Sequence, residues 1–380
     1  MIGAKQGILL EKRKVGFHMP KIVSVSTVHP PYELTQEETT EFARELFQDD
    51  FHDIGRLLAV FQNGQIKKRH FSMPLPWFER DHSLQERNDL YIELATEYGA
   101  KAAARCLNND WFLQQQVGYE EIDAIFFISS SGMATPGIEA RIMNRLPFSL
   151  DTKRIPIWGL GCAGGAAGIS RAYEYCVAFP KAKVLVLSVE LCSLTFQRND
   201  RSKSNLIGTS LFADGVACAL VAGDKANIRT KRLTPSILKT KSKLLPDSEN
   251  VMGWDLKDNG LHVVFSRDIP SIVRSWLGGF VEGFLQTSHL SIKEIAHFVA
   301  HPGGKKVLDA YEDTLQLAKD KTKHARTVLS EFGNMSSPTV LYVLERFMLD
   351  KVKHGDYGLM AALGPGFCGE LLLLKWGVEA

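Results

Sequence analysis

The stretch IPIWGLGCAGGAAGI, residues 155–169, runs an apolar, strand-like segment into a glycine-rich turn and then into a run of small residues. Gly159, Gly161 and Gly164 match the G-x-G-x-x-G spacing that binds the pyrophosphate of dinucleotides. Cys162 stands in the same turn, where the N-terminus of a following helix would favour a thiolate. The stretch therefore predicts a strand–turn–helix unit that holds either a dinucleotide or a nucleophilic cysteine.

Strands and helices alternate around this turn. Apolar runs at 122–132 and 183–191 are typical of strands, and a helix is expected over 166–180. Such alternation predicts an α/β fold with a buried sheet. The helix begins with the small residues 164–168, and each glycine there costs about 0.5–1 kcal/mol relative to alanine. That cost favours a helix packed closely between two sheets.

The same order of elements recurs in the second part of the chain. Three segments of the first part have counterparts in the second: 125–132 and 296–304, 159–175 and 332–347, 211–223 and 358–376. We therefore predict two similar halves, 19–230 and 231–380. A pseudo-twofold relation between them would bring Cys162 to face the turns that hold His301 and Asn334.

Composition and charge exclude several classes of protein. The 380 residues carry a net charge of only +2, so the protein has no overall positive electrostatic field that would attract nucleic acid or an anionic membrane. No apolar run is long enough to span a bilayer. Residues 1–18 are too charged for a signal peptide, so we expect a disordered or non-native leader. The six cysteines form no C-x-x-C pair, which predicts a reducing, cytoplasmic setting without disulfides or a metal site.

The two interpretations of the cysteine turn differ in what they explain. The dinucleotide interpretation would place Glu190 on a ribose, but it gives His301 and Asn334 no role. Individually, Cys162 could be a small buried residue, His301 a satisfied core histidine and Asn334 a helix N-cap. Together they supply a nucleophile, an imidazole and two donors for an oxyanion, which is what acyl transfer requires.

Six short segments follow one another along the chain: WGLGCAGG, SVELCSLTF, LFADG, HPGG, GNMSSP and ALGPG. In this order they resemble the type III polyketide synthases, the chalcone synthase-like family. The resemblance covers nearly the whole chain from about Met19. It implies a thiolase fold of duplicated halves in five αβαβα layers, and a homodimer that needs no metal or nicotinamide. It also implies that Cys162 carries a starter acyl group from its coenzyme A thioester. His301 and Asn334 would bind malonyl-CoA and stabilise the enolate formed when carbon dioxide leaves.

The resemblance further assigns a substrate cavity. Phe212 matches a gatekeeper phenylalanine, and Val263 occupies the second gatekeeper position, where its smaller side chain would widen the passage. Cys192 and Thr195 match residues that line the cavity. Thr135 replaces a methionine that, in plant members, reaches across the dimer. The loop expected to shape the cavity floor is Gly364, Pro365 and Gly366.

Coenzyme A carries three phosphates, so a basic rim is expected where it enters. Arg56 aligns with one basic residue of the family, whereas Ala59 and Asn63 replace two others. The remaining candidates for phosphate binding are Lys305, Lys67, Lys68 and Arg69.

The sequence therefore predicts a type III polyketide synthase that condenses an acyl-CoA with malonyl-CoA to give an alkylpyrone or alkylresorcinol. Val263 and the small residues near Cys192 favour a fatty acyl starter. The alternatives are an aromatic starter, as in chalcone and stilbene synthases, and a single-condensation ketoacyl synthase. A nicotinamide-binding oxidoreductase and an inactive acyl-CoA-binding protein are further alternatives, although retention of the three candidate catalytic residues argues against the last.

Overall fold

The structure, a computed structural model, describes residues 18–49, 51 and 53–377. The predicted leader lies outside these residues except for His18. The Nδ1 atom of His18 lies 2.8 Å from Oδ2 of Asp224, so this residue is attached to the body of the protein.

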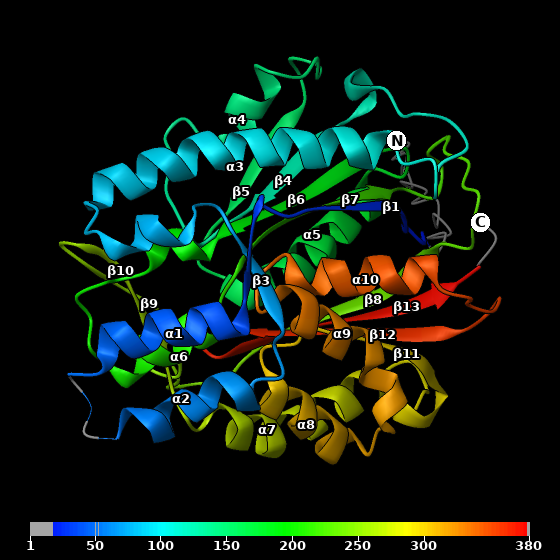
Figure 1. The fold of residues 1–380 in the computed structure, drawn as a ribbon. Helices are drawn as coiled ribbons and strands as arrows, with labels where there is room; N and C mark the ends of the chain where they lie inside the picture. The colour runs from blue at the N-terminus through cyan, green and yellow to red at the C-terminus, as the bar shows by residue number, and fades with distance from the viewer. Residues whose placement is uncertain (1–17, 50, 52, 378–380) are drawn as a thin grey trace, which may run out of the picture.

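Among the described residues, nine strands form one mixed sheet that has two parts (Figure 1). The first part has the order β5 (Lys153–Ile157), β4 (Ala124–Ile128), β6 (Lys183–Leu191), β7 (Asp214–Ala222) and β1 (Lys21–Val28). The second continues with β8 (Pro235–Leu244), β13 (Cys368–Trp376), β12 (Tyr357–Gly364) and β11 (Ile295–Ala300). The two parts meet at one backbone pair, Lys21 with Ser236.

Helices separate and cover the two parts of the sheet. Between them lie α5 (Gly164–Ala178) and α10 (Thr339–Leu349), and α5 contacts strands of both parts. The outer faces are covered by α3 (Leu84–Leu107) on one side and by α7 (Ile269–Gln286) and α8 (Lys305–Leu315) on the other (Figure 1). The resulting αβαβα layers confirm the predicted fold.

Shorter elements surround this framework. The helices are α1 (Gln36–Phe47), α2 (Ile54–Asn63), α4 (Ile138–Met143), α6 (Lys203–Leu211) and α9 (Lys323–Phe332). Two antiparallel strand pairs complete the fold: β2 (Tyr32–Thr35) with β3 (Lys68–Phe71), and β9 (Met252–Lys257) with β10 (Gly260–Phe265).

The small residues at the start of α5 allow the two halves to pack closely. A Cβ atom on Gly165 would lie 2.2 Å from the carbonyl oxygen of Ser337, and one on Gly168 would lie 2.7 Å from Ile128. Any larger residue would push α5 away from α10 or from the sheet. The prediction of a helix held tightly between two sheets is therefore confirmed.

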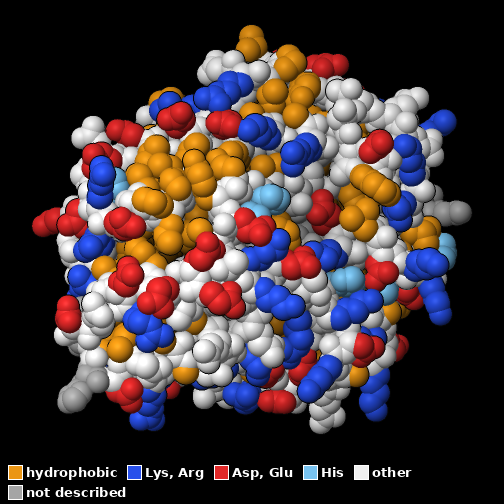
Figure 2. Space-filling model, viewed as in Figure 1, with side chains coloured by type: hydrophobic (Ala, Val, Ile, Leu, Met, Phe, Trp, Pro, Cys, Tyr) orange, Lys and Arg blue, Asp and Glu red, His pale blue; other side chains and the backbone are white. Residues whose placement is uncertain are grey.

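The surface agrees with the small net charge. Figure 2 shows basic and acidic side chains intermingled over the visible face, with apolar side chains gathered in patches among them. Within the described residues, no helix has the length and apolar character needed to cross a membrane.

Candidate active site

The predicted strand–turn–helix unit holds Cys162 at the start of α5. The chain leaves β5 through Gly159 and Gly161, whose φ angles of +87° and +44° favour glycine. Cys162 then lies in a short 3-10 turn directly before the helix. The backbone N–H of Gly161 donates to Oγ of Ser130 at 3.1 Å, which ties the turn to the segment after β4.

The space around the glycines does not suit a dinucleotide. A Cβ atom on Gly161 would lie 2.8 Å from the ring of Pro365, and one on Gly164 would lie 2.6 Å from Ile128. Likewise, a Cβ atom on Gly364 would lie 2.5 Å from the carbonyl oxygen of Leu160. These neighbours fill the room that a pyrophosphate would need. The loop of residues 364–366 thus packs against the nucleophile turn.

The structure brings the predicted cysteine and asparagine into contact. The Sγ atom of Cys162 lies 3.8 Å from Oδ1 of Asn334 and 3.6 Å from Oγ of Ser336. The Nδ2 atom of Asn334 donates to the carbonyl oxygen of Gly303 at 3.2 Å, in the turn that also holds His301. The three turns therefore meet, as the repeat predicted. Ser336 was missed, although it stands in the quoted segment GNMSSP.

His301 and Asn334 both retain unused hydrogen-bonding capacity. The His301 ring is buried, and neither Nδ1 nor Nε2 has a partner within the described part of the chain. Burial lowers the pKa of His301 to about 3, so the imidazole is neutral and carries one N–H donor. Asn334 has a second amide hydrogen beyond the one donated to Gly303. The two side chains can therefore offer two donors to an added oxygen.

The thiol and the imidazole are not paired in this geometry. Burial raises the pKa of the Cys162 thiol to about 11, and this effect outweighs those of its hydrogen bonds with Ser336 and Asn334. His301 makes no hydrogen bond to the thiol among the described contacts. Burial thus favours the neutral form of both groups, and the thiolate expected at this helix N-terminus stays a prediction.

Glu190 forms a buried network behind the nucleophile turn. Its carboxylate accepts hydrogen bonds from the Ser130 N–H at 3.0 Å and from the Ser337 hydroxyl at 2.9 Å. Burial raises the pKa of Glu190 to about 7. The sequence analysis considered this residue only as a ribose ligand. Its position in the apolar run KVLVLSVEL was the available signal, because a buried carboxyl group requires partners.

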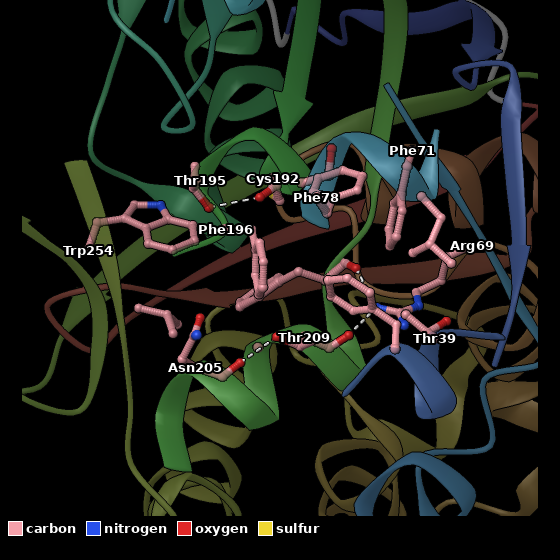
Figure 3. Close-up of a pocket in the computed structure, with 16 residues that line it drawn as sticks. Thr39, Arg69, Phe71, Phe78, Cys192, Thr195, Phe196, Asn205, Thr209 and Trp254 are labelled. Atoms are coloured by element: carbon pink, nitrogen blue, oxygen red, sulfur yellow. Dashed lines mark hydrogen bonds between the residues drawn. The ribbon is translucent and has the colours of Figure 1, made fainter. Parts of the chain in front are cut away.

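Four of the predicted cavity residues line one small cavity: Phe212, Cys192, Thr195 and Val263 (Figure 3). Its volume is about 60 Å³, which is room for one or two water molecules. The backbone N–H of Ala213 donates to the Asn334 carbonyl at 2.9 Å, so the segment that holds Phe212 is attached to Asn334. Six of the sixteen lining residues are aromatic: Phe42, Phe71, Phe78, Phe196, Phe212 and Trp254.

Val263 does not widen the passage as predicted. Trp254 is its cross-strand neighbour, and the Trp254 ring centroid lies 5.8 Å from that of Phe212. Phe265 packs edge-on against Phe212 at 6.3 Å. Trp254 on the adjacent strand and Phe265 on the same strand therefore place bulk beside Phe212 that position 263 lacks. The part of Trp254 was missed because the pairing of β9 with β10 is not visible in a position-by-position alignment.

Apart from Arg69, the other predicted residues are not among those that line this cavity. Thr135 is exposed in the loop after β4. Arg56 and Lys67 are also exposed, and Nζ of Lys68 lies 2.7 Å from the Glu33 carboxylate. Lys305 begins α8 and pairs with Asp309 at 2.6 Å.

Arg69 departs from its predicted role. Its side chain is buried, and Nη1 donates to the carbonyl oxygens of Thr209 at 2.6 Å and Phe212 at 2.8 Å. A phosphate at the surface cannot reach this guanidinium. The prediction that Arg69 binds coenzyme A at a solvated rim is therefore wrong.

Comparison with known proteins identifies the family. The model of the N-terminal domain of chalcone and stilbene synthases matches residues 19–225, and that of their C-terminal domain matches residues 236–377. The chain belongs to the chalcone and stilbene synthase family. It is 52% identical over 361 residues to a putative chalcone synthase of Bacillus subtilis strain 168, with 94% of this chain and 99% of the relative covered.

Two further likenesses are to tetrahydroxynaphthalene synthases. The 1,3,6,8-tetrahydroxynaphthalene synthase of Streptomyces peucetius subsp. caesius is 34% identical over 356 residues, with 93% of each chain covered. The crystal structure of the Streptomyces coelicolor A3(2) enzyme, described as a bacterial type III polyketide synthase, has a TM-score of 0.87 at 28% identity. It covers 94% of this chain and 99% of that one.

Membership of the family establishes the class of reaction. The chain is a type III polyketide synthase, an acyltransferase that performs Claisen condensations. The family uses coenzyme A thioesters as substrates and needs no additional cofactor. The oxidoreductase alternative is thereby excluded.

Proposed function

We propose that the protein extends a fatty acyl-CoA with several malonyl-CoA units and cyclises the product to an alkylpyrone or alkylresorcinol. The observation that carries the catalytic assignment is the contact between Cys162 and Asn334, whose amide also binds the turn that holds the unpartnered ring of His301. In the first step, the Cys162 sulfur attacks the starter thioester carbonyl. The acyl group moves to Cys162 and coenzyme A leaves as its thiol.

Chain extension uses the two remaining donors. His301 and Asn334 donate to the thioester oxygen of malonyl-CoA, so that loss of carbon dioxide leaves an enolate whose negative oxygen they stabilise. The enolate carbon attacks the acyl-Cys162 carbonyl and expels the Cys162 thiolate. The lengthened β-keto chain is then on coenzyme A, and its return to Cys162 begins the next cycle.

The apolar, aromatic wall of the cavity supports a hydrophobic starter. Its volume of about 60 Å³ requires these rings to move before a long chain enters. The small volume also favours a second candidate, a short starter. The relative named for tetrahydroxynaphthalene points the same way, because that ring system carries no alkyl chain.

The experiment is to incubate the protein and Cys162→Ala with malonyl-CoA and a series of aliphatic and aromatic acyl-CoA starters, followed by mass spectrometry. Cysteine-dependent products that grow by acetate units from decanoyl-CoA and longer starters would support the proposal. Turnover of only short or aromatic starters would overturn the fatty starter. Products with a single extension would support a ketoacyl synthase, and no consumption of malonyl-CoA with any starter would remove the synthase assignment itself.

We further propose that two copies associate at β5. This strand ends the sheet, its side chains are largely accessible, and Trp158 directly after it is 56% exposed. An open edge beside a large apolar side chain is a surface that proteins tend to cover. Thr135, in the loop after neighbouring β4, would then approach the partner. Light scattering that shows a monomer at micromolar concentration would contradict this.

Three other assignments remain proposals. Arg56, Lys67, Lys68 and Lys305 would bind coenzyme A phosphates, and Lys305→Ala should then raise KM for malonyl-CoA and the starter alike. The six free cysteines support a reducing, cytoplasmic location. The two halves 19–230 and 231–380 would be the repeated units.

A further inference from the structure

Arg69 is a buried cation with unused hydrogen-bonding capacity. It lies on β3 with 0% of its surface exposed, and one arm of the guanidinium binds the carbonyls at the C-terminal end of α6. Its Nε and Nη2 atoms have no partner among the described residues. Burial lowers the pKa of Arg69 to about 9, so it is still charged at neutral pH.

No carboxylate of the described residues forms an ion pair with Arg69. Asp214 is near enough to influence it, but that carboxylate accepts hydrogen bonds from the Ser72 N–H at 2.7 Å and from the N–H and hydroxyl of Ser193, both at 2.6 Å. A buried charge and buried N–H groups without acceptors are costly. The free edge of the guanidinium therefore needs an acceptor that the protein does not provide.

Arg69 is one of the residues that line the cavity (Figure 3). Its Nε and Nη2 atoms are themselves enclosed, so a bound oxygen reaches them only when the neighbouring side chains move to admit a chain. The hydroxyls in this wall already donate to protein oxygens, namely those of Thr39, Ser193, Thr195 and Thr209. The Asn205 amide donates to the carbonyls of Gln197 and Asp200. Of these side chains and Arg69, only Arg69 keeps N–H groups that can bind a molecule in the cavity.

We propose that Nε and Nη2 of Arg69 bind the keto or enolate oxygens of the growing poly-β-keto chain, an inference that rests on the proposed polyketide function. A malonyl-derived chain presents an oxygen on every second carbon, whereas an alkyl starter presents none. The cation therefore attracts the extended part of the chain towards α1 and α6. The aromatic walls remain for the starter.

The site is also close to the catalytic centre. Arg69 binds the Phe212 carbonyl, and Phe212 pairs through its backbone with Asn334. Arg69 is thus linked to Asn334, one of the donors proposed to stabilise the enolate, through the backbone of Phe212. Because the bound chain is oriented there, Arg69 would determine how many extensions occur before release.

The test compares Arg69→Met and Arg69→Lys with Arg44→Met, a matched change at an exposed arginine on α1. Intact-protein mass spectrometry follows starter loading on Cys162, and product analysis gives the distribution of chain lengths. We expect Arg69→Met to load the starter as the unchanged protein does and to release shorter products, with the longest product reduced about tenfold, as for loss of one hydrogen bond to a charged group. Arg69→Lys should fall between, and Arg44→Met should change nothing.

Equal loss of all products with an unchanged length distribution would show that Arg69 only supports the fold, and would overturn the proposal. An independent test measures binding of acetoacetyl-CoA and butyryl-CoA, which differ by one keto oxygen, to the Cys162→Ala protein. Adding Arg69→Met should reduce the preference for acetoacetyl-CoA about tenfold. An unchanged preference refutes the role of Arg69. A protein that shows this preference but makes no polyketide refutes the proposed function instead.

Discussion

Replacing Glu190 with glutamine should change how the stability of the protein depends on pH. Glu190 is 1% exposed, and burial raises its pKa from 4.5 to about 7. A shift of this size corresponds to about 3 kcal/mol. Because the folded state holds the proton more tightly than the unfolded state does, the stabilisation is complete below pH 4.5 and is lost as the pH rises through about 7.

Between pH 4.5 and 8, the unchanged protein should therefore lose about 3 kcal/mol of unfolding free energy relative to Glu190→Gln. The amide keeps the shape of the side chain and cannot ionise. The assay is urea unfolding followed by tryptophan fluorescence at several pH values and constant ionic strength. Glu93→Gln, at an exposed position on α3, is the matched control.

The quantity to compare is how the difference in unfolding free energy between the unchanged protein and Glu190→Gln changes with pH. The size of that difference at a single pH is not informative, because the amide also alters the hydrogen bonds from Ser130 and Ser337 at every pH. The difference should change by up to about 1.4 kcal/mol per pH unit between pH 5 and 7. A constant difference over this range would refute the reasoning, because it would mean that Glu190 has the same pKa in the folded and unfolded states.

Three other substitutions test the packing and the site. Gly165→Ala should destabilise the protein by about 1–3 kcal/mol, because its Cβ would lie 2.2 Å from the Ser337 carbonyl. Thermal unfolding measures this change. The control is Gly279→Ala, where a Cβ meets nothing within 4 Å, and it should not destabilise the protein. Val263→Phe should shorten the accepted starters, because it adds a ring beside Phe212 and Trp254, and product analysis showing longer starters would contradict the assignment of this wall. Asn334→Asp should slow malonyl-CoA decarboxylation about 10²–10³-fold while starter loading on Cys162 persists; loss of both would show that Asn334 acts on the thiol.

The sequence predicted the features that repeat or that require glycine. The convergence of the turns holding Cys162, His301 and Asn334 followed from two similar halves, and the structure shows Cys162 and Asn334 in contact. The tight placement of α5 followed from residues 164–168. These predictions succeed because glycine at a close approach and a repeated order of elements leave a direct trace in the sequence.

Features that depend on side-chain packing could not be predicted in this way. The run Lys67, Lys68, Arg69 is typical of a solvated surface. Arg69 is nevertheless fully buried, unlike the two lysines before it. Its burial depends on Gly333, where a Cβ would lie 2.8 Å from the Arg69 side chain. The contact joins positions far apart in the chain, so no local pattern reveals it. The covering of Phe212 by Trp254 was hidden for the same reason.

The packing of Gly333 against Arg69 also links the gate to the catalytic amide. Gly333 has a φ of +70°, which favours glycine, and it directly precedes Asn334. Asn334 donates its N–H to the Leu211 carbonyl at 3.0 Å, and Arg69 binds the next carbonyl along, that of Phe212. If the segment that holds Phe212 moves, it should therefore shift both the asparagine proposed to bind the enolate oxygen and the cation proposed to bind the extended chain. Because the same backbone pairing joins them, we expect opening of the cavity for a longer starter and positioning of the next malonyl unit to be coupled.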